Sequence, residues 1–118
     1  MRQLILGAAL LALAPVAAQA QDAAAGEKVF AACKACHAFG KNGVGPDLKG
    51  VMGRKAGTHE GYNYSAAMKN SGLTWDEATF TDYIKDPKGK VPGNKMIYAG
   101  LKDDKKIQDL IAYLKTQQ

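Results

Sequence analysis

The sequence predicts an all-α protein in which a few helices are joined by two long loops. Apolar residues recur at helical spacing near both ends of the chain, and no stretch shows the sustained alternation that is typical of a strand. Residues 38–61 and 86–100 instead contain many glycine or proline residues and have no period. Because long loops without structure are uncommon in a compact domain, these two loops indicate a bound group around which the chain wraps.

The first twenty residues have the pattern of a cleavable secretory signal peptide. Arg2 provides a positive charge, residues 4–14 are apolar or small, and Ala18 and Ala20 are the small residues that a signal peptidase reads. These eleven apolar residues are too few to cross a bilayer, which takes about 20. We therefore expect cleavage after Ala20, a periplasmic location and a single domain over residues 21–118.

The first helix of that domain is expected to carry both cysteines of the chain. Its face is formed by residues that recur at helical spacing, namely Gly26, Phe30, Cys33, Cys36 and His37. A glycine inside a helix costs about 1 kcal/mol relative to alanine. Gly26 therefore indicates that a second helix crosses the first one at close range.

The last helix is the expected partner in that crossing. It should start at Asp103 and Asp104 and end near Lys115, with charges that suit the helix dipole. Its apolar positions follow the spacing of a helix with one buried face, namely Ile107, Leu110, Ile111 and Leu114. This face should pack against the first helix beside Gly26.

Two further helices are expected between these ends. A short helix should run over residues 65–70 and close at Gly72. Another should cover residues 74–85, because the threonine that opens it and Glu77 form a capping-box pattern. It should stop there because the residue before Pro87 avoids helical geometry.

Cys33, Cys36 and His37 form a C-x-x-C-H motif, the attachment signature of c-type haem. On a helical turn, positions i and i+3 lie on one face, so two thiols can add to the two vinyl groups along one edge of a porphyrin. The histidine at i+4 then points its imidazole toward the iron. The motif predicts one haem c per chain, attached through Cys33 and Cys36, with His37 as an axial iron ligand.

Other chemistries also use cysteines at this spacing. A thiol–disulfide oxidoreductase carries C-x-x-C directly after a strand, and no strand is predicted here. A zinc site needs four ligands; His59 would complete the set, but the three residues of the motif would crowd onto one helical turn. A structural disulfide would close a very short loop and would stabilise the fold little. Haem attachment is the interpretation that the pattern favours.

The second axial ligand is expected to be a methionine. Met96 lies in a loop that is punctuated by proline and glycine, so it is free to approach the iron. Met52 and Met68 are the alternatives, although a methionine more often fills a core. His59 is a further candidate, although an exposed loop histidine is the commoner outcome.

From Gly26 onward the sequence resembles a class I cytochrome c, of the bacterial cytochrome c2 type that is similar to mitochondrial cytochrome c. The resemblance covers essentially all of residues 21–118. Its motifs are CKACH at 33–37, GVGPDLKGVMGRKAG at 43–57, GYNYSAAMKNSGLTW at 61–75, YIKDPKGKVPGNKMIYAG at 83–100 and DLIAYLK at 109–115. It implies the small cytochrome c fold, with N- and C-terminal helices crossing and long loops wrapping the covalently bound haem.

The resemblance also implies roles around the iron. Met96 is the second axial ligand, as in the His/Met ligation of cytochromes c. The Pro46 carbonyl accepts the Nδ1 hydrogen of His37 and so orients the ring. Tyr83 packs close to Met96. Asn94 stands where the family frequently has threonine, so the hydrogen bonding around Met96 does not follow from the resemblance.

Three residues are implied at the haem propionates. Tyr64 and Trp75 should each hydrogen-bond a propionate, and Arg54 should lie nearby. The rings of Tyr64 and Trp75 could equally be ordinary core residues, because each ring buries a large area.

The function implied is electron transfer without enzyme activity, because an iron that is bound by both His37 and Met96 has no open position. The implied partners are membrane redox complexes of a respiratory or photosynthetic chain: a cytochrome bc complex together with a terminal oxidase or a photosynthetic reaction centre. Two other classes stay open at this point. A protein without haem would be a thiol–disulfide oxidoreductase, and a haem protein in which Met96 does not bind would be a ligand sensor or a peroxidase.

The basic residues predict how such partners are recognised. The chain has a net charge of +5, and no acidic residue occurs in residues 28–46 or 87–102. If these stretches meet in space, they form a basic face that can dock on acidic sites, with Lys34, Lys41, Lys88, Lys90 and Lys95. A nucleic-acid partner is not expected, because residues 21–118 contain a single arginine. We expect a monomer.

Overall fold

The computed structural model describes residues 21–118, and the expected signal peptide at residues 1–20 lies outside the described residues. Within residues 21–118 the helices are α1 (Ala23–Phe30), α2 (Ala66–Lys69), α3 (Glu77–Lys85), α4 (Pro87–Lys90) and α5 (Asp104–Lys115). The extended pairing within residues 21–118 is one isolated bridge, between Lys55 and Thr74. The all-α prediction is confirmed. No helix in this part of the chain is long and apolar enough to cross a membrane.

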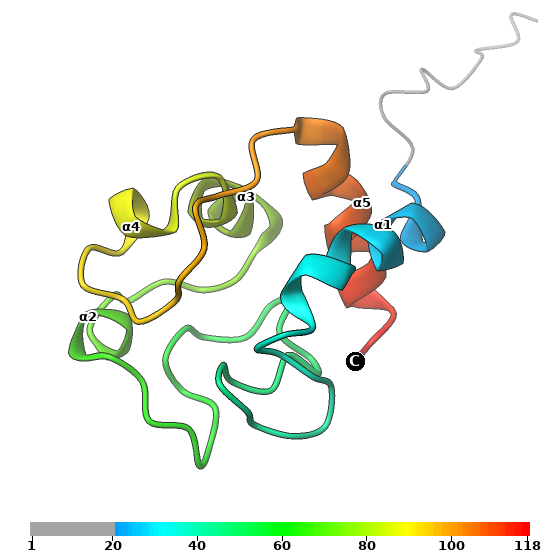
Figure 1. Cartoon of the computed structure of the whole chain (residues 1–118). Coiled ribbons are helices and arrows are strands. Elements are labelled where there is room, and N and C mark those ends of the chain that lie inside the picture. The colour runs from blue at the N-terminus through cyan, green and yellow to red at the C-terminus, as the bar shows by residue number, and fades with distance from the viewer. Residues whose placement is uncertain (1–20) are drawn as a thin grey trace, which may run out of the picture.

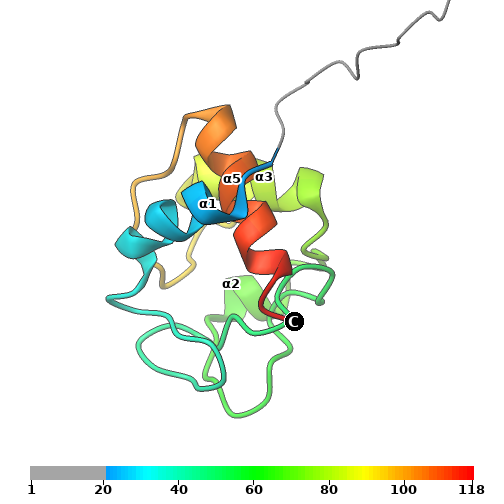
Figure 2. The same cartoon turned by 90° about the vertical axis from the view of Figure 1, so that its right-hand side faces the viewer.

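The helices α1 and α5 cross at one side of the molecule, as both views show (Figures 1 and 2). At the crossing, Gly26 faces the backbone of Asp109, and a Cβ atom added to Gly26 would lie 2.9 Å from the Cβ atom of Tyr113 and closer still to the Asp109 carbonyl. The start of α1 is tied to the same partner, because the backbone N–H of Asp22 donates to Oδ1 of Asp109 at 3.0 Å. The predicted close crossing at Gly26 is confirmed.

The first helix is shorter than predicted. The α-helix ends at Phe30 and tightens into a 3₁₀ turn, η1 (Ala31–Cys33), as helix C-termini often do. The expectation of one continuous helix through His37 is therefore wrong. Residues 33–37 nevertheless keep the geometry of one helical turn, because the His37 N–H donates to the Cys33 carbonyl at 2.9 Å.

The helix α3 starts later than its capping-box pattern indicates. Thr74 is engaged in the bridge with Lys55, and Asp76 caps the helix instead by accepting the N–H of Thr79 at 2.7 Å. A carboxylate is a strong N-cap group, so the start moves to Glu77. The helix α2 agrees with its prediction, with Ser65 as the N-cap.

The helix α4 was not expected from the sequence. Asp86 caps it by accepting the N–H of Gly89 at 3.0 Å, and Pro87 occupies its first turn, where the missing N–H has no helical partner to lose. The rest of residues 86–100, and all of residues 38–61, contain no helix, as predicted.

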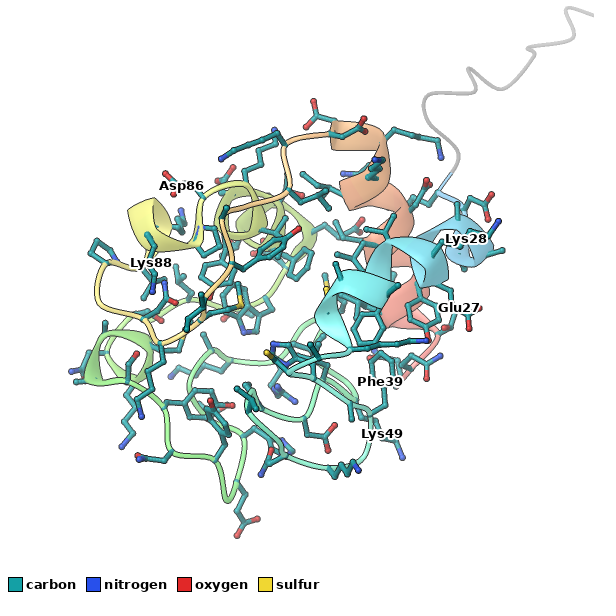
Figure 3. The ribbon with its side chains drawn as sticks, viewed as in Figure 1. Glu27, Lys28, Phe39, Lys49, Asp86 and Lys88 are labelled. Atoms are coloured by element: carbon teal, nitrogen blue, oxygen red, sulfur yellow. The ribbon has the colours of Figure 1, made fainter. Side chains whose placement is uncertain are left out.

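A cluster of aromatic rings joins the first long loop to the helix crossing. Phe39 lies beneath α1 and beside α5 (Figure 3). Its ring stacks on Phe30 with centroids 4.9 Å apart and meets Tyr113 of α5 edge-on at 5.8 Å. The loop that follows His37 is therefore anchored to the same crossing that fixes α1.

Replacing Gly26 with alanine separates helix propensity from helix packing. Propensity alone predicts that G26A stabilises the fold by about 1 kcal/mol. The contact with Asp109 predicts the opposite sign, a loss of about 1–3 kcal/mol, because the added methyl group has no room. Chemical denaturation of the holoprotein measures the difference.

A matched control is Ala24→Gly on the exposed side of the same helix, which should cost only about 1 kcal/mol. An increase in the stability of G26A would contradict the close crossing.

Candidate functional site

A cavity of about 230 Å³ lies between the helices and the two long loops. One water molecule needs only about 10–15 Å³ on this measure, so the space suits a sizeable ligand. Its walls are largely apolar and aromatic, with Phe30, Leu48, Val51, Trp75, Phe80, Ile84, Leu110 and Leu114 among them. Val44 and Ile97 also line it and are 74% and 98% exposed, so they mark its mouth.

All three residues of the C-x-x-C-H motif line this cavity. Cys33 is half-buried and Cys36 is exposed, and both are free thiols in the structure. Burial, and then the neighbouring charge of Cys36, raise the pKa of the Cys33 thiol. The end of η1 and the turn that follows it thus present two thiols and one imidazole to the same space.

The His37 ring is oriented from two sides. Its Nδ1 lies 2.9 Å from the Pro46 carbonyl oxygen, which only accepts, so Nδ1 carries the hydrogen. Burial lowers the pKa of His37, which favours the neutral ring and leaves Nε2 with a free lone pair. On the other side lies Gly45, where an added Cβ atom would come within 2.7 Å of Nδ1 and Nε2. Glycine at this position lets the loop approach the ring.

Met96 and Met68 line the same cavity, whereas Met52 belongs to the core. Met96 differs from Met68 in having a hydrogen-bond donor at its sulfur, because the Tyr83 hydroxyl lies 3.8 Å from Sδ. Burial raises the pKa of Tyr83 to about 12, so this hydroxyl keeps its hydrogen at neutral pH. The contact between Tyr83 and Met96 that the resemblance implied is present.

The three residues expected near the propionates also line the cavity. Arg54 and Trp75 are neighbours through their backbones, since the Trp75 N–H donates to the Arg54 carbonyl at 2.9 Å. The Trp75 ring packs on Tyr83 with centroids 4.8 Å apart. The Tyr64 hydroxyl accepts the backbone N–H of His59 at 3.2 Å.

Arg54 is held by a polar network that sequence reasoning missed. Its guanidinium donates to the Asp47 carbonyl at 2.8 Å and lies 3.4 Å from Nδ1 of His59. The Asp47 carboxylate is buried, accepts the N–H groups of Gly40 and Lys49 at 2.8 Å each, and lies 3.7 Å from Nε2 of His59. The one sequence signal for this network was the position of Asp47 directly after Pro46. The other members could not be predicted, because the fold of the loop brings them together.

His59 therefore belongs to this network. The zinc set that would have joined His59 to the C-x-x-C-H motif is not supported, because no group of three or more His, Cys, Asp or Glu residues that could hold a metal occurs within residues 21–118.

The five lysines of the expected basic face have different surroundings. Lys95 lines the cavity and donates to the Asn63 carbonyl at 3.0 Å. Lys88 donates to the Asn94 carbonyl at 2.6 Å, and Lys90 lies 3.9 Å from the Asp82 carboxylate. Lys34 and Lys41 have no side-chain partner among the described residues.

The donor set fits haem c. Two free thiols lie at the spacing that thioether attachment requires, and a neutral imidazole and a thioether sulfur face the same large apolar space. Fold and site together define a class: small helical proteins whose loops enclose a covalently anchored haem.

Comparisons with known proteins agree with this class. The cytochrome c family model matches residues 23–118. The chain is 56% identical to cytochrome c2 of Blastochloris viridis over 118 aligned positions, which cover 98% of this chain and 93% of that protein. It is 57% identical to cytochrome c-550 of Bradyrhizobium diazoefficiens over 95 positions, or 78% and 70% of the two chains. The solved structure of cytochrome cH from Methylobacterium extorquens is 64% identical and superposes with a TM-score of 0.79, over 80% of this chain and 98% of that one.

The chain belongs to the cytochrome c family, of the class I cytochrome c2 type. Members of this family carry covalently attached haem c and transfer electrons, so the protein is an electron carrier and not an enzyme. The alternative of a thiol–disulfide oxidoreductase is thereby excluded.

The Asp47 network predicts a pH effect on stability. Burial alone would raise the pKa of this carboxyl group, but the N–H groups of Lys49 and Gly40, and then the charges of His59 and Arg54, hold it below its ordinary value of 3.8. A lowered folded-state pKa means that the carboxylate stabilises the fold above about pH 4 and that this stabilisation is lost as the pH falls further. Asp47→Asn should therefore be less stable at neutral pH and lose less stability on acidification.

Denaturation at a series of pH values from 7 to 3 measures this difference. Glu60→Gln is the control, because Glu60 is exposed on the same loop and its side chain has no partner among the described residues. An unchanged acid dependence in Asp47→Asn would show that the network does not hold the carboxylate ionised.

Proposed function

We propose that this protein is a one-electron carrier of the periplasm in which His37 and Met96 are the axial ligands of haem c. One observation supports this most directly: Cys33, Cys36, His37 and Met96 all line one cavity, although Met96 lies far along the chain. Haem c, when bound, supplies a single iron centre that is oxidised and reduced by one electron. The expected removal of residues 1–20 on export agrees with a periplasmic location.

His37 and Met96 would keep the ligation constant during the reaction. The Pro46 carbonyl fixes the tautomer of His37, so that Nε2 keeps a free lone pair with which it would hold the iron. The Tyr83 hydroxyl, at 3.8 Å from Sδ, restrains the thioether of Met96. Two permanent protein ligands leave no position for dioxygen or peroxide, and a methionine ligand raises the reduction potential.

Arg54, Tyr64 and Trp75 would surround the haem propionates. Arg54 brings a positive charge to the cavity wall, and the Asp47 network holds its side chain in place. The backbone pairing of Arg54 with Trp75 keeps the two side chains on adjacent parts of that wall. In this role the arginine offsets the negative charge of a propionate that lies partly out of water.

Partner docking is assigned to the mouth of the cavity. Val44 and Ile97 are exposed apolar residues there, and Lys95 lines the same cavity. With Lys34, Lys41, Lys88 and Lys90, Lys95 would form the basic face that steers the protein to acidic sites on a cytochrome bc complex and on an oxidase or reaction centre. Such encounters are small and transient, and they suit a monomer.

The ligand assignment predicts different spectra for two methionine variants. The oxidised wild-type holoprotein should show the weak near-infrared band of sulfur–iron ligation. Met96→Leu should lose this band, whereas Met68→Leu, which alters a second methionine of the same cavity, should retain it. Visible and near-infrared absorption of the purified holoproteins measures both.

A band that persists in Met96→Leu and disappears in Met68→Leu would move the ligand to Met68. A wild-type protein that carries haem, lacks the band and binds small ligands would support the sensor or peroxidase instead.

The docking assignment predicts a salt-dependent rate. The double variant Lys34→Glu/Lys41→Glu should reduce the second-order rate of electron transfer with a purified cytochrome bc complex by about tenfold at low ionic strength, with little effect at high salt. Lys28→Glu is the control, because Lys28 lies on α1 and outside the proposed face (Figure 3). Wild-type rates that do not depend on ionic strength would contradict steering by this face.

A further inference from the structure

Asn94 is buried and makes an unusually complete set of hydrogen bonds just before Met96. The residue is 5% exposed. Its Nδ2 donates to the carbonyl oxygens of Pro87 and Val91, at 2.8 Å each, and its Oδ1 accepts the backbone N–H of Met96 at 2.8 Å. One side chain thus joins both ends of α4 to the backbone of Met96.

The main chain of Asn94 is fixed as well. Its N–H donates to the Val91 carbonyl at 3.1 Å, and its carbonyl accepts the Lys88 ammonium group at 2.6 Å. Lys88 extends from α4 toward the segment that follows it (Figure 3). We call these five hydrogen bonds around Asn94 the Asn94 hub.

The hub matters because the residue directly after Met96 is not anchored by packing, and the next backbone hydrogen bond to a helix comes at Leu101, whose N–H donates to the Ile84 carbonyl at 2.8 Å. Ile97 is 98% exposed, and residues 97–103 contain no helix. Met96 packs against the edge of the core, and two hydrogen bonds fix it further: the Asn94 bond to its N–H and the Tyr83 hydroxyl near its sulfur.

We propose that Asn94 is a positioning residue that holds Met96 at the iron by tying its backbone to α4. This inference rests on the proposed function, in which Met96 is the ligand. The hub would hold the Met96 sulfur at the position from which it binds iron, so that an external ligand would compete with it less well.

The chemistry of the side chain explains why asparagine suits this role. A buried amide supplies two N–H donors and an acceptor oxygen, and the hub uses all three. Serine or threonine has a single O–H donor, so one of the two carbonyls, Pro87 or Val91, would keep only its backbone N–H donor. Aspartate keeps the acceptor but loses both donors, and it would place a charge beside two carbonyl oxygens.

External imidazole tests the proposal, because it binds the oxidised iron only where Met96 has left. In the holoprotein, Asn94→Ala should bind imidazole about tenfold more tightly than wild type, since it leaves three backbone groups without this partner. Asn94→Ser retains one donor and an acceptor, so its imidazole affinity should lie between those of Asn94→Ala and the wild type. Loss of the near-infrared band during titration gives the affinity.

Val91→Ala is the matched control for a general loss of stability. Val91 is buried in the same segment, and shortening it removes packing while the hydrogen bonds of Asn94 remain. Its denaturation midpoint should fall, with less than about a threefold change in imidazole affinity. Equal imidazole affinity in Asn94→Ala and wild type, or an equal gain in Val91→Ala at matched stability, would overturn the proposal.

A measurement on the wild type does not depend on the folding of any variant. The amide hydrogen of Met96 should exchange with solvent far more slowly than that of its exposed neighbour Ile97. Fast exchange at Met96 would overturn the hub, even where the near-infrared band shows that Met96 is the ligand. Absence of that band in the wild type would instead overturn the ligand assignment on which the inference rests.

Discussion

The structure depends on a central apolar space that the chain does not fill with its own side chains. Trp75, Phe80 and Leu110 belong at once to the core and to the wall of the cavity. A domain of this length buries a limited apolar area. When haem c fills the space, it adds apolar contacts to residues of α1, α2, α3 and α5, and it gives the two long loops a surface to pack on. The cofactor and the apolar core therefore stabilise the fold together, as one unit.

The crossing of α1 and α5 is the rigid frame on which that unit is assembled. Gly26 allows the close approach, and Phe30 extends from the end of α1 to both the cavity and the aromatic cluster. The thiols and the imidazole follow within one turn of this frame. The proposed opposite ligand, Met96, comes instead from a segment that is ordered by hydrogen bonds, chiefly those of Asn94. The His37 side of the site thus rests on the helix crossing, whereas the Met96 side depends on hydrogen bonds as well as on its packing against the core.

The elements that could be predicted were those whose cause is local in the sequence. The C-x-x-C-H motif, the apolar face of α5 and the glycine at the crossing each carry their physical reason within a few residues. The start of α3 was placed too early because Thr74 pairs with Lys55, a contact that no local pattern records. The Asp47 network and the Asn94 hub were missed for the same reason.

The contact between α1 and α5 joins the two ends of the described chain. Closing so long a loop has an entropic cost before any contact offsets it, and such a topology has a high contact order for a helical protein. The native frame cannot form until the last helix is available. A chain that is still being synthesised therefore has no completed core, and folding must wait for α5.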